Sequence, residues 1–284
     1  MSATSLLHRP ARTLEAHHEG HLLWAYTYDG YDFHPHFHPV TIPGGATLTM
    51  RAPGDHPWHE GIFFSWKYLN GRNVWEQPSD QPHGGPVHRS IETTKTGFLH
   101  HIDWADEVGT PLLHEKRTIH WQWRPTQRAL IFDWDLSFEA AREPVTCERE
   151  MRWGGYGGLS VRCARGSLPE FATAEGPIPS EVKDANPTSP WVSFVFNPDG
   201  LPSRTWHEHR AGVAVFDHPE NFGHPGAWWC YKGMHKINAC LLQRAPLVLL
   251  PGQPLRLRYR ILAHHGPADP LALAACWRDY STSA

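Results

Sequence analysis

A strict alternation of apolar and polar side chains is the feature of this sequence that most limits its fold. In residues 130–139, LIFDWDLSFE, Trp134 and its apolar neighbours would share one face, and Asp135 and the other polar residues the opposite face. The same two-residue period recurs in 46–51, ATLTMR, and in 255–261, LRLRYRI. A strand with this period buries one face and wets the other, as strands of antiparallel sheets do.

The rest of the chain predicts one large sandwich. Further strands are expected at residues 61–69, 117–124, 158–165, 190–197 and 211–218. Helical patterns are few and short, and the best is PLALAACWRDYS, 270–281, with a proline at its start. We expect an all-β fold, a large antiparallel β-sandwich forming a single domain over 21–284, after a ragged N-terminus over 1–20. Residues 175–190 are predicted to be a long exposed loop, which is either a lid or an insertion with no role.

Composition excludes several classes of function. The chain has 26 Lys and Arg against 29 Asp and Glu, so no basic surplus favours binding to nucleic acid. It has no apolar run of about 18 residues, so no membrane span is expected. The first residues do not resemble a secretory signal, which favours a cytoplasmic protein. The five scattered cysteines contain no CxxC pair and predict no disulfide framework. A small-molecule substrate is the expected partner, and a homo-oligomer is left open.

The segment PGDHPWHEG, 53–61, is the strongest candidate site in the sequence. It reads as a structured turn that leads into a strand. Asp55 is expected to orient a histidine through its ring N–H, and His56 or His59 would then act as a general base or a metal ligand. The alternative interpretation is a turn in which Asp55 bonds only its own backbone.

The segment FHPHFHP, 33–39, places three histidines at every second position. In an extended chain His34, His36 and His38 would share a face and could hold Zn, Fe, Cu or Mn. The flanking prolines remove ladder donors, so a solvated sheet edge is the alternative. The cofactor is therefore left open between a divalent metal and none, with His38, His56 and His59 as the candidate ligands.

A third cluster of candidates lies in GVAVFDHPENFGHPGAWW, 212–229. A strand ends at Asp217 and His218, and His224 follows in a loop rich in Pro and Gly. Polar residues at the end of a buried strand are often used to build sites, although they also serve as turn caps.

Isolated residues complete the candidate set. Arg162 is expected on a strand, where a buried arginine needs an anionic partner. Glu76 is a candidate partner or acid. Trp66 and Trp228 are expected to pack against a sugar ring, since tryptophan offers a flat apolar face. No glycine-rich motif opens a helix, so no nucleotide cofactor is expected.

These motifs together resemble the bacterial PmoA-like family, also called the methane oxygenase PmoA family. The matching segments are HPHFHP (34–39), PGDHPWHEGIFFSW (53–66), NGRNVWE (70–76), GLSVR (158–162), GVAVFDHPENFGHP (212–225) and GQPLRLRYR (252–260). The resemblance implies a β-supersandwich similar in shape to galactose mutarotase and an association with sugar catabolism. The family name is a misnomer for this chain, because a true methane monooxygenase subunit spans the membrane.

Most of the family's positions carry over to this sequence. The matching candidate site residues are His38, Asp55, His56, His59, Glu76, Arg162, Asp217, His218 and His224. Three departures stand out. Residues 34–36 are His-Pro-His where the family tends to have Arg-Pro-Tyr, Trp58 replaces a histidine, and Glu60 replaces an arginine.

The leading hypothesis is an enzyme that acts on a sugar or sugar-like molecule by general acid–base chemistry, as an epimerase, lyase or hydratase. His56 or His59 would be the base, and His38 and His218 would be the second acid–base groups or metal ligands. Arg162 would hold a carboxylate or a developing oxyanion. Two alternatives remain, a metal-dependent enzyme built on the histidine cluster and a non-catalytic carbohydrate-binding sandwich.

Overall fold

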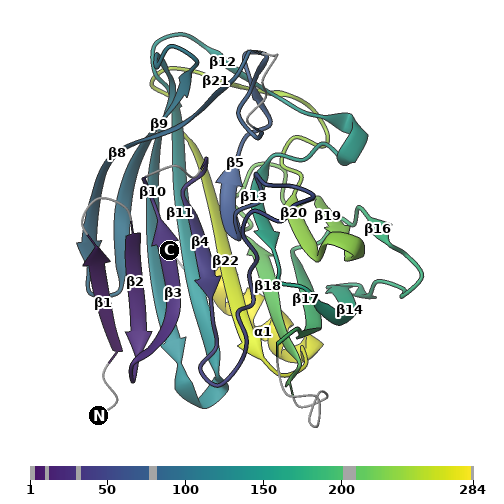
Figure 1. Ribbon diagram of the computed structural model, residues 1–284. Coiled ribbons are helices and arrows are strands. Elements are labelled where there is room, and N and C mark those ends of the chain that lie inside the picture. Colours follow the sequence, from purple (N-terminus) through teal and green to yellow (C-terminus); the bar gives the residue numbers. More distant parts are fainter. Residues whose placement is uncertain (1–3, 10–12, 30–32, 77–81, 201–208, 283–284) are drawn as a thin grey trace.

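Two large antiparallel sheets packed face to face form the body of the protein (Figure 1). The computed structural model describes residues 4–9, 13–29, 33–76, 82–200 and 209–282. The predicted all-β antiparallel sandwich is confirmed.

The first sheet carries the N-terminal strands at one edge. Its strands, in spatial order, are β1 (Thr4–Arg9), β2 (Thr13–His18), β3 (His21–Thr27), β4 (His36–Val40), β5 (Ile62–Ser65), β13 (Gly158–Arg162), β20 (Lys236–Ala239), β19 (Trp228–Tyr231) and β16 (Asp184–Ala185).

The second sheet contains the longest strands. Their spatial order is β15 (Gly176–Pro177), β14 (Gly166–Thr173), β17 (Trp191–Pro198), β18 (Ala211–Asp217), β22 (Leu255–His265), β11 (Ala129–Ala140), β10 (Pro111–Arg124), β9 (Gly97–Asp106) and β8 (Gly84–Thr94). A small third sheet contains β21 (Leu247–Leu249), β12 (Val145–Glu148), β6 (Tyr68–Leu69) and β7 (Arg72–Asn73). Short 3-10 turns lie at Pro125–Gln127, Met151–Trp153 and Lys232–Met234.

Aromatic rings fill the space between the two large sheets. Phe37 of β4 packs against Phe132 and Trp134 of β11, with ring centroids 4.9 and 5.6 Å apart. Phe64 of β5 packs against Phe138 of β11 at 4.8 Å. All of these rings are buried, and each contributes roughly 1.5–3 kcal/mol of hydrophobic stabilisation. The alternation predicted for 130–139 therefore supplies the second sheet's half of the core.

The helix α1 (Pro270–Ser281) lies where the sequence predicts it. Its first turn is capped by Asp269, whose carboxylate accepts a hydrogen bond from the backbone N–H of Leu271 at 3.0 Å. Leu273 and Tyr280 bury one side of the helix in a cluster with Phe216 of β18. The helix thus covers part of the second sheet's outer face.

Two sequence predictions about strands are wrong. Residues 46–51 form only isolated bridges and no continuous strand, because Thr47, Thr49 and Arg51 bridge three different segments, at Thr41, Cys163 and Glu60. The N-terminus is not ragged throughout, since 13–18 form β2 and 4–9 form β1. The alternation in TLEAHH, with Leu14 and Ala16 fully buried, was the signal for β2.

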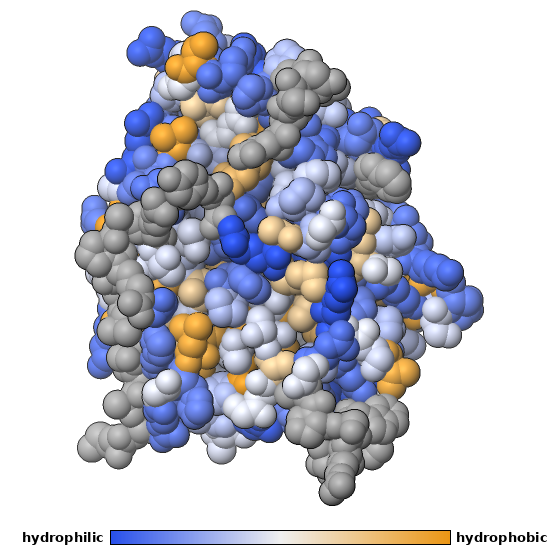
Figure 2. All heavy atoms as spheres, viewed as in Figure 1, coloured by the Kyte–Doolittle hydropathy of each residue, from blue (hydrophilic) through white to orange (hydrophobic). Residues whose placement is uncertain are grey.

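The surface in view is mainly polar, and its hydrophobic residues lie in small separate groups (Figure 2). No helix among the described residues is long and apolar enough to cross a membrane.

Candidate active site

The central strands of the first sheet are buried on both faces. One face packs on the shared core, and the other carries polar side chains. Arg162 of β13 is the direct cross-strand partner of Lys236 of β20, which in turn is the partner of Tyr231 of β19. Direct partners point to the same side of a sheet, so these three side chains form one row. The neighbouring residues Val161 and Ile237 point the opposite way, into the core.

A cavity of about 330 Å³, called here the main cavity, lies over this row. Its volume is within the range of roughly 300–1,000 Å³ found for small-molecule sites. Its lining residues come from the turn 53–60, the segment after β7, the loop before β13, strands β16, β19 and β20, and the 3-10 turn Lys232–Met234. They are His56, Trp58, His59, Trp75, Glu76, Tyr156, Asp184, Trp229, Tyr231, Met234 and Lys236.

Lys236 is the most unusual residue of the main cavity. Its side chain is 1% exposed, and its Nζ lies 2.8 Å from Nε2 of His59. Burial, with the nearby charge of Arg162 as a further cause, holds the pKa of Lys236 well below its usual value. The ring centroids of Trp75 and Trp229 lie 5.0 and 5.4 Å from Nζ and favour the charged form. The pKa of Lys236 is lowered overall, because desolvation of a fully buried amine outweighs the cation–π attraction.

His59 shares this buried environment. Burial, reinforced by Lys236 and His56, lowers the pKa of His59 well below its usual value, so its ring is neutral. Its Nδ1 is buried and has no hydrogen-bond partner among the described residues. The ring stacks on that of His56, with centroids 4.7 Å apart and planes 10° apart. His59 therefore presents to the amine a neutral imidazole whose other ring nitrogen makes no hydrogen bond to the described residues.

His56 is oriented as the sequence predicts. Its Nδ1 lies 2.7 Å from Oδ2 of Asp55, and the same oxygen accepts a hydrogen bond from Nη2 of Arg162 at 3.1 Å. Burial raises the pKa of Asp55, but the hydrogen bond from His56 and the charge of Arg162 outweigh it and leave the pKa lowered. The carboxylate thus links the histidine turn to strand β13.

Glu76 lines another wall of the main cavity. Its carboxylate accepts hydrogen bonds from Lys67, from Nδ2 of Asn73 at 2.7 Å and from the hydroxyl of Tyr156 at 3.2 Å. Lys67 is also buried, so this is a compensated pair of charges. The two buried lysines near the cavity therefore have different partners, a carboxylate for Lys67 and an imidazole for Lys236.

Arg162 also borders a more open neighbouring cavity of about 520 Å³, called here the arginine cavity. Arg162 is 5% exposed, and its Nε and Nη1 have no partner among the described residues. Met234 lines both this cavity and the main one. Met234 therefore lies between the two cavities, and Arg162 lines the arginine cavity.

His34 and His36 take structural roles. The ring nitrogens of His34 lie 3.2 Å from the carboxylate of Glu60 and 3.1 Å from the carbonyl oxygen of Val74. Glu60 also accepts the backbone N–H of His34 at 2.7 Å. His36 donates from Nδ1 to the carbonyl oxygen of His34 at 2.8 Å. These contacts hold β4 in place beside β5.

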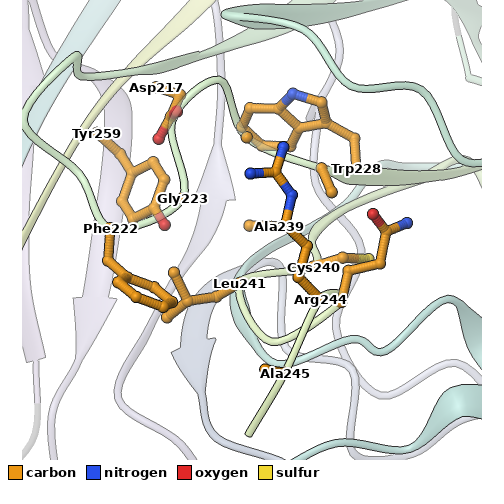
Figure 3. A pocket seen from close by; sticks show the side chains of 13 residues that line it. Asp217, Phe222, Gly223, Trp228, Ala239, Cys240, Leu241, Arg244, Ala245 and Tyr259 are labelled. Atoms are coloured by element: carbon orange, nitrogen blue, oxygen red, sulfur yellow. The ribbon is translucent and has the colours of Figure 1, made fainter. Parts of the chain in front are cut away.

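The residues predicted from 212–229 lie away from the main cavity. Asp217 and Trp228 line a second cavity of about 180 Å³, shown in Figure 3 together with Tyr259 and Arg244. Asp217 accepts hydrogen bonds from His224 at 2.6 Å and from Asn221 at 2.7 Å, and it orders the loop after β18. The prediction that Asp217, His218 and His224 belong to the same site as His59 is therefore wrong.

Two other predicted groups are also misplaced. Trp66 and Trp228 are fully buried and belong to the shared core, and neither of them lines the main cavity. Strand alternation turns Trp229, and not Trp228, toward the main cavity. His38 bonds the hydroxyl of Thr49 at 2.9 Å and does not line the main cavity, and burial lowers its pKa to about 4.

The predicted metal ligands do not converge. Within the described part of the chain, no three His, Cys, Asp or Glu side chains lie close enough together to hold a metal ion. His38 is held by Thr49, and the stacked rings of His56 and His59 are joined to different partners, Asp55 and Lys236.

Sequence reasoning missed several residues of the main cavity. Five residues that line it were not candidates, although Trp75 lies in the segment NGRNVWE and Trp229 ends the segment 212–229: Lys236, Tyr156, Trp75, Trp229 and Asp184. Asp184 comes from the loop predicted over 175–190, which the structure uses to form β16 and one wall of the cavity. Only the register of β13, β20 and β19 shows that these positions meet.

A family model described as "Family of unknown function (DUF6807)" matches residues 13–278. The chain belongs to this family. The match covers both large sheets apart from β1, and every residue that lines the main cavity. No curated protein matches the chain. The resemblance to the PmoA-like proteins stays a prediction.

Solved structures with a similar outline share little sequence with this DUF6807 protein. A candidate mutarotase, YeaD, from Salmonella typhimurium is 10% identical, with a TM-score of 0.37, 92% of this chain covered and 90% of that chain. The protein HI1317 is 6% identical, with a TM-score of 0.35 and 92% and 99% covered. The polysaccharide lyase BACCELL_00875 is 14% identical, with a TM-score of 0.34, and the match covers 94% of this chain but 33% of the lyase. Scores this low carry no argument about function.

Proposed function

We propose that this DUF6807 protein is a cytoplasmic enzyme that moves a proton at a carbon next to the carbonyl of a sugar-like substrate, as an epimerase, lyase or hydratase. One observation carries the proposal. A fully buried lysine amine contacts a neutral imidazole, Lys236 to His59, at the wall of an aromatic cavity of about 330 Å³.

The chemistry follows from the protonation states of this pair. Burial lowers the pKa of both groups, which favours the unprotonated, basic form of each. A base inside a cavity that excludes water can take a proton from a weakly acidic C–H, and the negative charge that develops needs a cation nearby. Arg162, on the neighbouring strand, supplies that positive charge.

The walls of the main cavity suit a polyhydroxylated ligand. Trp58, Trp229 and Tyr231 offer flat apolar faces of the kind that pack against sugar rings. Glu76 and Asp184 add carboxylates that can accept hydrogen bonds from hydroxyl groups. This combination of rings and acceptors supports a sugar-like substrate.

Proton exchange tests the proposal without knowledge of the product. A panel of aldoses, ketoses and keto-sugar acids is incubated with the protein in D₂O, and loss of the C–H signal next to the carbonyl is followed by NMR. His59→Gln is expected to slow exchange by about 10²–10⁴-fold, the usual contribution of a general base. The control His120→Gln replaces an exposed histidine of β10 and is expected to leave the rate unchanged.

The outcomes separate the rival functions. Exchange that depends on His59 supports the enzyme. Binding of panel compounds with no exchange in any of them would instead favour the non-catalytic carbohydrate-binding sandwich, for which the aromatic walls alone are sufficient.

A further inference from the structure

The buried amine of Lys236 contacts an imidazole and, among the described residues, no carboxylate. Its polar contact is with an imidazole nitrogen of His59, at 2.8 Å. The second buried lysine, Lys67, lies against the carboxylate of Glu76, which stabilises its ammonium form. A lysine kept only for structure would need a partner like Glu76, because an unpaired buried charge is costly.

The surroundings of Lys236 match the two conditions that activate a lysine. The amine is desolvated by aromatic side chains, and another cation faces it from the neighbouring strand, since Arg162 is its direct cross-strand partner. Desolvation and a neighbouring positive charge both favour the neutral amine, the form that attacks carbonyl carbons.

We propose that Lys236 forms an imine with the carbonyl carbon of an open-chain aldose or ketose in the main cavity, with His59 as its proton shuttle. This inference deepens the proposed function and rests on it, because it assigns the covalent form in which the substrate would lose its proton.

The step balances without any further reagent. The Nζ lone pair forms a bond to the carbonyl carbon, and a proton of the amine moves through Nε2 of His59. The carbonyl oxygen receives this proton and a second proton from solvent and leaves as water, so a protonated C=N bond replaces the C=O bond. His59, neutral again, then takes the proton of the neighbouring C–H, and the protonated imine accepts the electron pair that this releases.

The aromatic walls favour this intermediate. The rings of Trp75, Tyr156 and Trp229 lie 5.0, 5.9 and 5.4 Å from Nζ, close enough to attract a cation. A protonated imine keeps its positive charge with fewer N–H donors than an ammonium ion, so it loses less hydration in this space. The same rings exclude the water that would hydrolyse it.

Reductive trapping on the intact, unmodified protein tests the inference. The protein is incubated at pH 7 with glyceraldehyde or dihydroxyacetone and sodium cyanoborohydride, which reduces an imine to a stable secondary amine. Peptide mapping by mass spectrometry then measures the label on each lysine. Lys67 is the buried reference, and Lys95 and Lys116 are exposed references.

Lys236 is expected to be labelled faster than all three references. Each unit by which the pKa of a lysine is lowered multiplies its neutral fraction at pH 7 by about ten. Because the readout is positional within one protein, no variant has to fold. Labelling of Lys95 and Lys116 while Lys236 stays unlabelled would overturn the inference. His59→Gln, which keeps the amine, is expected to slow the labelling of Lys236.

The two proposals can fail separately. Deuterium exchange that depends on His59, with no trapped adduct at Lys236, would overturn the imine and leave non-covalent acid–base catalysis. A trapped adduct at Lys236, with no exchange across the sugar panel, would keep the nucleophile and overturn the proposed proton transfer.

Discussion

The charge state of Lys236 makes a stability prediction that requires no substrate. In the unfolded chain the pKa of a lysine is about 10.4, and in the folded protein burial lowers that of Lys236. Between these two pKa values the unfolded state binds one proton more than the folded state. Protonation therefore favours unfolding at the lower pH, and the free energy of unfolding rises as the pH rises through this window.

The magnitude is set by one proton. Relative to a Lys236→Met variant, the wild-type protein gains about 1.4 kcal/mol of stability for each pH unit between the two pKa values. We expect the methionine variant to be the more stable protein at pH 7, because it removes an amine that must lose its proton and its hydration to fold. That advantage is expected to shrink steadily as the pH approaches 10.

Urea unfolding followed by tryptophan fluorescence measures this difference at several pH values. The other titrating groups are common to both proteins and cancel in the comparison. Lys95→Met, at an exposed position of the β8–β9 turn, controls for the loss of a lysine without the loss of a buried amine. A difference between wild type and Lys236→Met that stays constant from pH 7 to 10 would refute the reasoning, since Lys236 would then be charged in the fold and poorly suited to attack a carbonyl.

Two further predictions concern buried contacts. Arg117→Met is expected to cost roughly 3–5 kcal/mol of unfolding free energy, because it leaves the fully buried Glu115 carboxylate without its cation, whereas Arg256→Met removes a largely exposed pair and is expected to cost about 0–1 kcal/mol. Urea unfolding of both variants checks this, and equal losses would contradict it. Trp228→Ala is expected to cost roughly 3–5 kcal/mol of unfolding free energy, because Trp228 is fully buried. Trp229→Ala is expected to weaken the binding of sugars measured by calorimetry, because Trp229, and not Trp228, lines the main cavity.

The fold could be predicted where hydrophobic patterning alone decides the structure. Strand β11 follows the alternation of LIFDWDLSFE, and helix α1 begins after the Asp269 cap and Pro270. Prediction failed at 46–51, where the alternation is real but the lack of a continuous partner strand prevents a ladder. Alternation predicts which face of a segment is apolar, and pairing depends on neighbours that are distant in the sequence.

The candidate site could be predicted only in part. Asp55, His56 and His59 lie within one short turn, so their proximity is visible in the sequence. Lys236 lies in the segment MHKINAC, which contains no other candidate site residue. It contacts His59 only because β20 pairs with β13. For the same reason, the sequence pattern could not tell which of the two tryptophans at 228 and 229 faces the main cavity.

Two departures from the PmoA-like pattern, at His34 and Glu60, have one structural explanation. His34 and Glu60 both depart from the PmoA-like pattern, and each alone invites a functional interpretation. In the fold they contact each other, with Glu60 accepting hydrogen bonds from both the backbone and the ring of His34. Both ring nitrogens of His34 contact protein oxygens, those of the Glu60 carboxylate and of the Val74 carbonyl, so neither nitrogen is open to a metal. The two residues are thus best explained together, as a structural pair that joins the segment before β4 to the turn before β5, and the proposed chemistry rests on His59 and Lys236.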